Sequence, residues 1–92
     1  MMTLIEYNEL IDMLNRGHEV EFEYKGRYYY LEREEFEQIL YEKSVDGKII
    51  TQIETFEVET IEERIDNFVS KKMFDGNSFV HLYSEIEIID VD

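Results

Sequence analysis

The stretch HEVEFEYKGRYYYLER, residues 18–33, decides the fold of this chain. In its first half, acidic and apolar residues alternate strictly, which places Val20, Phe22 and Tyr24 on one side of an extended chain and glutamates on the other. This period of two is typical of a half-buried β-strand. Lys25-Gly26 is a tight-turn signal, and the residues after it return as the second arm of a hairpin.

The second arm contains three consecutive tyrosines, Tyr28, Tyr29 and Tyr30. Successive side chains of a strand point to opposite faces, so the three rings must be divided between the two faces of the hairpin. At least one ring is therefore partly exposed, unless another element covers the outer face.

Residues 34–43 fit two interpretations. A helix would gather Phe36, Ile39 and Leu40 on one side, whereas a strand would point Ile39 and Tyr41 inward. We favour the strand, because the turn signal VDGK and the β-branched run IITQI follow directly. A strand–turn–strand unit uses both signals, and a helix would leave the turn without a partner strand.

The residues before the hairpin predict a helix over residues 4–16. Thr3 and Glu6 have the T-x-x-E spacing of a capping box, in which each side chain bonds the free backbone N–H of the other residue. An apolar stripe with helical spacing follows: Tyr7, Leu10, Ile11 and Leu14. Gly17 supplies the left-handed residue that ends the helix.

A second helix is predicted to begin at Thr60, where Thr60 and Glu63 again have the spacing of a capping box. Its apolar stripe consists of Ile61, Ile65, Phe68 and Val69. Lys71 and Lys72 are expected in its last turn, where cations interact favourably with the helix dipole.

The end of the chain predicts a short third helix and a last strand. Residues 75–78 (DGNS) form a loop and a candidate N-cap, and Phe79, Leu82 and Tyr83 follow with helical spacing. The strand EIEIIDVD directs inward Ile86, Ile88 and, as a third candidate, Val91. The order α-β-β-β-β-α-(α)-β describes one α+β domain over residues 1–92, with a small antiparallel sheet of about four to five strands and two or three helices packed on it.

The charge balance restricts the functional class. The 92 residues include 23 Asp and Glu against 9 Lys and Arg, a net charge of −14, while 43% of them are hydrophobic. The chain is too apolar for a disordered acidic tail and too acidic to bind nucleic acid directly. It shows neither a signal peptide nor an apolar run long enough for a membrane span, so we expect a soluble, cytoplasmic protein with no membrane partner.

The sequence contains no motif for catalysis or metal binding. His18 and His81 lie in no ligand spacing, and the DGNS loop lacks the pattern of a calcium site. The serines belong to no nucleophile elbow, and cysteine is absent. We therefore expect no enzyme activity, no metal site and no cofactor.

Three acidic arrays remain as candidate partner-binding sites. The first is the strand row of Glu19, Glu21 and Glu23. The second surrounds the start of the second helix and contains Glu54, Glu57, Glu59, Glu62, Glu63 and Asp66, with Arg64 as the only cation among them. The third closes the chain and contains Glu85, Glu87, Asp90 and Asp92. Each array could be a solvated face that serves only solubility, but so large an excess of acid favours a basic partner.

The strand row resembles a nucleic-acid backbone in its spacing. Alternate side chains of a strand lie roughly 6.6 Å apart, which is close to every second phosphate of one DNA strand. In size, charge and lack of cysteine, the chain resembles the small acidic inhibitors that phages deploy against host nucleic-acid-binding machinery, the anti-CRISPR type among them. This resemblance implies a non-enzymatic inhibitor that mimics nucleic acid and occupies a basic nucleic-acid-binding surface of a partner protein.

A second resemblance concerns the layout of the chain. The segments GHEVEFEYKGRYYYLE and EIEIID look like those of small uncharacterised proteins of Gram-positive bacteria and their phages, from which no function transfers. The alternative hypothesis is a general protein-interaction or structural module, in which Tyr28, Tyr29 and Tyr30 provide an aromatic anchor. The acidity would then serve only solubility, and a homodimer is compatible with both hypotheses.

Overall fold

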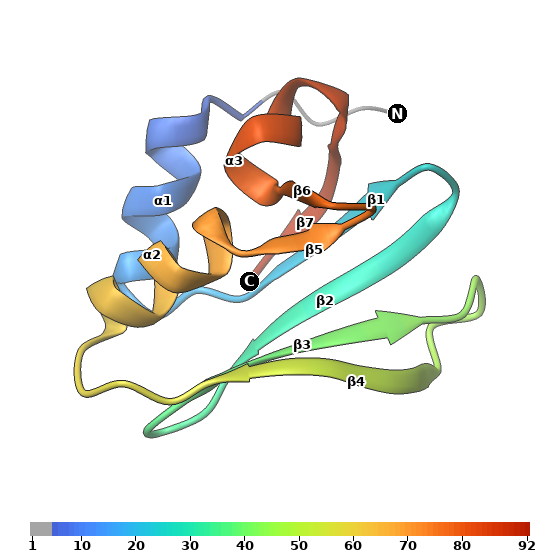
Figure 1. The fold of residues 1–92 in the computed structure, drawn as a ribbon. Helices are drawn as coiled ribbons and strands as arrows, with labels where there is room; N and C mark the ends of the chain where they lie inside the picture. Colours follow the sequence, from blue (N-terminus) through green and yellow to red (C-terminus); the bar gives the residue numbers. More distant parts are fainter. Residues whose placement is uncertain (1–4) are drawn as a thin grey trace.

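Residues 5–92, which the computed structural model describes, form three helices and seven strands around one core (Figure 1). The elements are α1 (Tyr7–Asn15), β1 (Val20–Tyr24), β2 (Arg27–Arg33), β3 (Gln38–Lys43), β4 (Ile49–Phe56), α2 (Ile61–Ser70), β5 (Lys72–Phe74), β6 (Asn77–Ser78), α3 (Phe79–Leu82), a 3-10 turn (Tyr83–Glu85) and β7 (Glu87–Val91). This order confirms the predicted α+β class and adds a small hairpin between α2 and α3.

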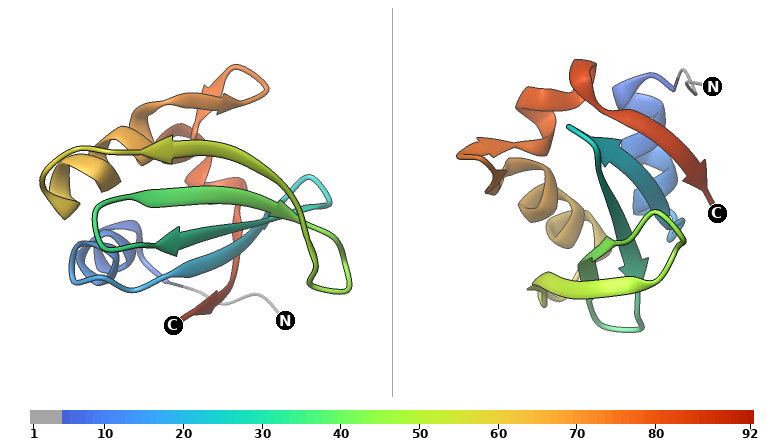
Figure 2. Two further views of the ribbon diagram at one scale, coloured as in Figure 1. Left: turned by 90° about the horizontal axis from the view of Figure 1, so that it is seen from below. Right: turned by 90° about the vertical axis from the view of Figure 1, so that its right-hand side faces the viewer.

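Five of the strands form one antiparallel sheet with the order β4-β3-β2-β1-β7, so β4 and β7 are its edges. The three helices lie together on one side of this twisted sheet (Figure 1). Seen from below, the strands β1–β4 lie in front of α1 and α2 (Figure 2). One face of the sheet is therefore covered by helices, and we call the other the open sheet face.

Phe22 lies at the centre of the core between the sheet and the helices. The alternation predicted for β1 is confirmed, because Val20, Phe22 and Tyr24 are buried and the glutamates between them point to the open sheet face. The ring centroid of Phe22 lies 5.3 Å from that of Tyr29 and 5.1 Å from that of Phe79. Burial of such a side chain stabilises a fold by about 1.5–3 kcal/mol, and each aromatic pair adds about 0.5–1.5 kcal/mol.

The predicted turn at Lys25-Gly26 is confirmed. Both residues have positive φ, 52° and 79°, as the central residues of a type I′ hairpin turn require. The twist of this turn matches that of the strands and sets a register in which Phe22 lies opposite Tyr29. The glutamates of β1 consequently lie opposite Tyr28 and Tyr30 on the open sheet face.

The ambiguous segment forms strand β3, so the strand interpretation is confirmed, but the predicted inward face of this strand is wrong. Leu40 lies opposite Leu31 in the core, whereas Ile39 and Tyr41 lie on the open sheet face, where Ile39 is buried and Tyr41 half-buried. The inward set begins with Gln38, a polar residue that is only 1% exposed. The prediction assumed that apolar residues mark the inward face of a strand. That assumption fails here because the first inward residue of β3 is a buried amide, Gln38.

Helix α1 begins at Tyr7 rather than at residue 4. Glu6 has an extended backbone with φ −66° and ψ 146°, so it is not the third helical residue and the predicted capping box is wrong; its partner Thr3 lies outside the described residues. The carbonyl oxygen of Ile5 accepts a hydrogen bond of 2.8 Å from the Tyr83 hydroxyl, which holds this segment outside the helix. The glycine after the helix has a φ of 95° and ends it as predicted.

Helix α2 begins as predicted but ends earlier. The hydroxyl oxygen of Thr60 accepts a hydrogen bond of 3.1 Å from the backbone N–H of Glu63, which caps the helix. The prediction that Lys71 and Lys72 lie in the last turn is wrong, because the helix ends at Ser70 and Lys72 starts β5.

Of the loop predicted at residues 75–78, Asp75 and Gly76 form the turn of the hairpin β5–β6, whereas Asn77 and Ser78 form its second strand. The two turn residues have φ of 54° and 82°, and the preceding Phe74 is buried in the core. Ser78 caps α3 as predicted, since its hydroxyl oxygen accepts a hydrogen bond of 3.3 Å from the backbone N–H of His81.

Strand β7 contains a β-bulge that explains its irregular apolar pattern. Two consecutive residues of β1 lie opposite Ile88 and Asp90, so Ile89 is the extra residue. The bulge lets Ile88 and Val91 both pack on the core although they are three positions apart. Ile86, just before the strand, is also buried as predicted.

Candidate partner-binding surfaces

The open sheet face carries the predicted strand row. Strand pairing places further polar and aromatic side chains around it: Tyr28, Tyr30, Glu32, Tyr41, Lys43, Glu87 and Asp90. Glu23 lies opposite Glu87, and Glu21 lies opposite Asp90, so acids of the first and third arrays meet on this face. Like charges at cross-strand positions repel one another, and Lys43 is the cation that lies among them.

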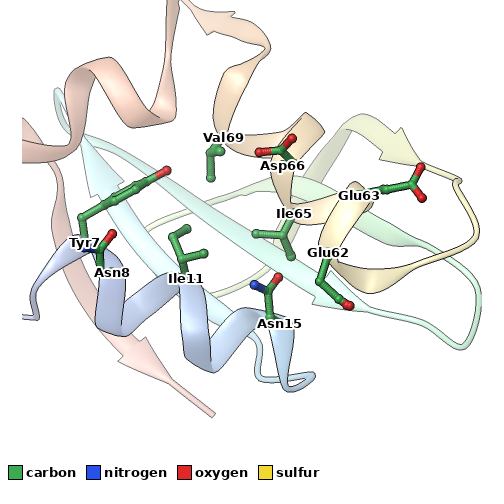
Figure 3. Close-up of a pocket in the computed structure, with 9 residues that line it drawn as sticks. All are labelled: Tyr7, Asn8, Ile11, Asn15, Glu62, Glu63, Ile65, Asp66 and Val69. Carbon is green, nitrogen blue, oxygen red and sulfur yellow. The ribbon is translucent and has the colours of Figure 1, made fainter.

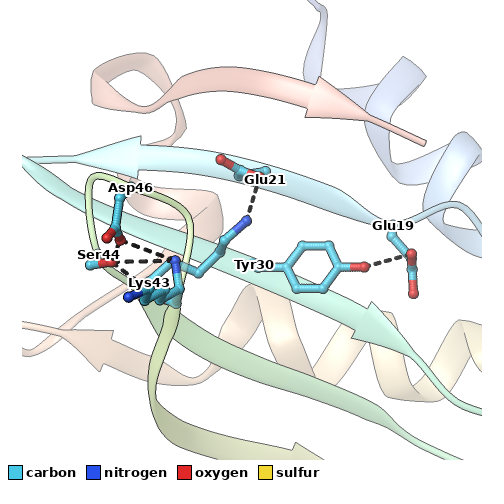
Figure 4. Close-up of polar contacts among 7 residues, drawn as sticks. Glu19, Glu21, Tyr30, Lys43, Ser44 and Asp46 are labelled. Atoms are coloured by element: carbon cyan, nitrogen blue, oxygen red, sulfur yellow. Dashed lines mark hydrogen bonds and ion pairs between the residues drawn. The ribbon is translucent and has the colours of Figure 1, made fainter.

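Glu19 and Glu21 are engaged within the sheet (Figure 4). The Tyr30 hydroxyl donates to Glu19 Oε1 at 2.6 Å, and the backbone N–H of Arg33 donates to Glu19 Oε2 at 2.9 Å. Lys43 Nζ donates to Glu21 Oε1 at 2.9 Å and lies 5.2 Å from the centre of the Tyr30 ring. Burial raises the pKa of Tyr30 far above its usual range, and the hydrogen bond to Glu19 adds to this effect. A partner cation at these two carboxylates would therefore compete with donors that the sheet already supplies.

The three tyrosines of β2 divide between the two faces, as predicted. Tyr28 and Tyr30 are half-buried on the open sheet face. Tyr29 is 6% exposed and packs against Phe22 and Phe74 with centroid distances of 5.3 Å and 5.2 Å. Tyr29 is therefore a core residue, and only its two neighbours are accessible to a partner.

The second array is held by α2 and by the segment before it. Five of its six acids are exposed: Glu57, Glu59, Glu62, Glu63 and Asp66. The sixth, Glu54, forms an ion pair with Lys71, and this hydrogen bond lowers the pKa of the Glu54 carboxyl. Arg64 is only 3% exposed, and its Nε donates to the carbonyl oxygen of Thr60 at 3.3 Å. Within residues 5–92, no ion pair involves the five exposed acids.

Part of this array has a structural role. The carboxylate of Glu63 accepts a hydrogen bond of 3.3 Å from the Thr60 hydroxyl, and Glu62 and Glu63 lie in the first turn, where acids offset the helix dipole. Glu62 and Asp66 are four positions apart and therefore share one face of the helix. The helix thus presents neighbouring carboxylates to solvent without a cation between them.

A groove of about 430 Å³ lies between α1 and α2 (Figure 3). Its walls combine apolar and acidic side chains: Tyr7, Ile11, Ile65, Val69, Glu62 and Asp66. Asn15 also lines it, and the buried Oδ1 of this residue has no hydrogen-bond partner among residues 5–92. The sequence predictions missed this site because they treated Tyr7 and Ile11 only as part of an apolar helix stripe, whereas both are half-buried and line the groove.

The rest of the third array does not form one surface. Glu85 is exposed in the 3-10 turn, while Asp92 exchanges backbone hydrogen bonds of 3.1 Å and 2.9 Å with Glu19. His18 Nδ1 lies 3.0 Å from the Asp92 carbonyl oxygen, and His81 is exposed on α3. In the described part of the chain, no group of three or more His, Asp or Glu residues is placed to hold a metal ion.

No helix among the described residues is long and apolar enough to cross a membrane. No protein-family model, no curated protein and no solved structure matches this chain.

Proposed function

We propose that this protein is a non-enzymatic acidic binding protein, an inhibitor that occupies a basic nucleic-acid-binding surface of a partner protein. The observation that carries the proposal is the second array. Its five exposed acids, two in the segment before α2 and three on the helix, form no ion pair with any residue between 5 and 92. A rigid helix that holds unpaired carboxylates close together is complementary to a surface built to bind phosphates.

The charge excess would act mainly on the rate of association. Opposite charges on two proteins steer their encounter, and the resulting rate falls steeply as salt is added. Binding also brings cations to carboxylates that otherwise repel one another. We therefore assign the contact surface to the second array and not to the strand row, because Glu19 and Glu21 already have partners in the sheet and Glu23 lies on the open sheet face, which the helices do not cover.

A second candidate function, the general interaction module, is favoured by a different observation. Tyr28 and Tyr30 are half-exposed on the open sheet face, and Ile49 and Ile50 on the edge strand β4, two strands away, are 55% and 60% exposed. Aromatic side chains of this kind are enriched at interface hot spots. Binding through these residues would depend on apolar contact and hence only weakly on salt.

The experiment that tests the proposal is a pull-down from host lysate at low and high salt, with and without competing DNA or RNA. We expect a partner that is retained at low salt, released at high salt and displaced by nucleic acid. The double variant Glu59→Lys, Asp66→Lys should weaken binding by about tenfold or more. Its matched control, Glu35→Lys with Glu85→Lys, changes the charge equally at exposed positions outside the second array and the strand row. Retention that ignores both salt and nucleic acid would contradict the proposal and support the interaction module.

A further inference from the structure

We infer that the groove between α1 and α2 binds an arginine side chain of the basic partner. The inference rests on the proposed function and assigns a specific site to it. Figure 3 shows the side chains of the two helices facing each other across the groove, with Ile11 and Asn15 on one wall and Ile65 and Asp66 on the other. The volume of about 430 Å³ is ample for one long side chain.

The apolar walls fit the stem of such a side chain. Ile11, Ile65 and Val69 line the groove, and Ile65 and Val69 also belong to the core. Long cationic side chains lay their methylene groups on apolar surface while the charged head keeps polar contacts. A small hydrated cation would leave these walls unused, so the groove favours an amphipathic ligand.

The polar groups of the groove are mostly acceptors. Glu62 and Asp66 contribute carboxylates at its rim, and none of the described residues that line it is basic. The Oδ1 of Asn15 is buried and lacks a hydrogen-bond partner within residues 5–92, so a small turn of this side chain towards a ligand that brings a donor would satisfy it. An anion would be repelled, and a ligand made only of acceptors would leave Oδ1 unpaired.

Among cationic side chains, arginine matches this arrangement best. Its planar guanidinium carries five N–H donors, which can serve an amide oxygen and a carboxylate at the same time, whereas lysine carries a compact and strongly hydrated charge. The Tyr7 ring at the end of the groove offers a surface on which a guanidinium can stack. Burial and the nearby Asp66 raise the pKa of Tyr7, so its hydroxyl stays neutral beside the acid.

The test uses the full chain, a hexa-arginine peptide and a hexalysine peptide at moderate salt. Isothermal titration measures the affinity, and methyl NMR signals of Ile11, Ile65 and Val69 report whether the groove is occupied. We expect the hexa-arginine peptide to bind more tightly and to shift these signals more than hexalysine.

Two variants of Asn15 and two matched controls at Gln52 give the decisive comparison. Gln52 is exposed on β4 and lies opposite Tyr41 on the open sheet face, away from both helices. Asn15→Asp should bind hexa-arginine about tenfold more tightly than Gln52→Glu, because it places a charged acceptor beside the guanidinium. Asn15→Leu should bind it about tenfold more weakly than Gln52→Leu. Melting temperatures of all four variants show whether each is folded.

Several results would overturn the inference. If the Asn15 and Gln52 variants bind equally, or if the peptide binds without moving the three methyl signals, the acids act as a diffuse charge and the groove is not the site. Salt-sensitive partner binding in the pull-down would still support the proposed function in that case. Methyl signals that shift with protein concentration in the absence of peptide would assign the groove to a second copy of the chain and would also overturn the inference.

Discussion

The acids of the strand row and those of the second array look alike in sequence, but they differ in what they contact. Glu19 and Glu21 accept hydrogen bonds from neighbouring strands, whereas Glu59, Glu62 and Asp66 are exposed and form no ion pair with any described residue. A sheet brings the side chains of adjacent strands within roughly 5 Å of each other, so an acid there acquires neighbours from other strands. A surface helix directs its polar face to solvent. The net charge of a chain therefore does not tell how many of its carboxylates are free to bind.

The largest effect should come from the side chain that separates the two faces of β1. Phe22→Ala removes the ring at the centre of the core, and we expect it to lower the free energy of unfolding by about 3–5 kcal/mol. Glu23→Ala, on the opposite face of the same strand, should change it by less than about 0.5 kcal/mol. Urea denaturation of both variants measures the difference. If Phe22→Ala and Glu23→Ala lowered the free energy of unfolding by similar amounts, the open sheet face would have to be covered in solution.

The next effect tests whether Glu19 stabilises the sheet. Glu19→Leu leaves the Tyr30 hydroxyl and the Arg33 N–H without their acceptor, so we expect a loss of about 1–2 kcal/mol. Glu59→Leu on the second array should be nearly neutral. A double-mutant cycle that combines Glu19→Leu with Tyr30→Phe isolates the interaction of these two side chains. The two losses in the free energy of unfolding should be coupled, and additive losses would contradict the role assigned to Glu19.

The hydrogen bond between Tyr30 and Glu19 also leads to a prediction for stability at alkaline pH. The pKa of Tyr30 is raised above the ordinary tyrosine value of 10.0. Its contribution to stability is therefore fully present below pH 10 and is lost as pH rises through the raised folded-state value. Glu19→Leu should move the Tyr30 titration, followed by ultraviolet absorbance, back towards the ordinary value. An unchanged titration would show that burial alone causes the shift.

The sequence predicted the hairpin, the element order and most of the core because those features are local. The alternation around Phe22, the positive-φ turn at Lys25-Gly26 and the cap at Thr60 each depend on a few adjacent residues. The start of α1 and the face of β3 were wrong because distant contacts decide them. Tyr83 holds the backbone before α1 from 78 positions away along the chain, and the buried amide of Gln38 leads the inward face of β3.

The candidate site was predictable only in part, for a similar reason. The exposure of Glu62, Glu63 and Asp66 follows from the helical pattern, and the structure exposes five of the six acids of the second array. The groove beside them depends on how α1 packs against α2, which no local pattern encodes. Asn15 carries no signal in the sequence, because an asparagine near the end of a helix is usually solvated or a cap.

A smaller effect on stability should distinguish a partly buried ion pair from an exposed one. Lys43 and Glu21 form a pair whose side chains are 16% and 29% exposed, whereas the side chains of the Arg16–Asp12 pair on α1 are 64% and 67% exposed. Lys43→Met should cost about 1 kcal/mol, since it also removes the cation over the Tyr30 ring. Arg16→Met should cost about 0.3–0.5 kcal/mol at most, and this cost should vanish at high salt. If Lys43→Met and Arg16→Met lowered the free energy of unfolding equally at high salt, the Lys43–Glu21 pair would gain nothing from its partial burial in the sheet.

The smallest effect concerns two carboxyls whose pKa values move in opposite directions. Burial, together with the neighbouring Glu34, raises the pKa of Glu32 on the open sheet face above its ordinary value of 4.5, whereas the hydrogen bond from Lys71 lowers that of Glu54. The contribution of Glu32 is therefore present below pH 4.5 and is lost as pH rises through its raised folded value. The contribution of Glu54 is present above pH 4.5 and is lost as pH falls through its lowered value.

Carboxyl NMR titration should show both shifts in the intact protein. Glu32→Gln should flatten the part of the stability profile just above pH 4.5, and Lys71→Met should flatten the part below it. Each change should be well under 1 kcal/mol because solvent screens both groups. If Lys71→Met instead leaves the acid side of the profile unchanged, Glu54 belongs with the unpaired acids of the second array, and the proposed contact surface gains a sixth carboxylate.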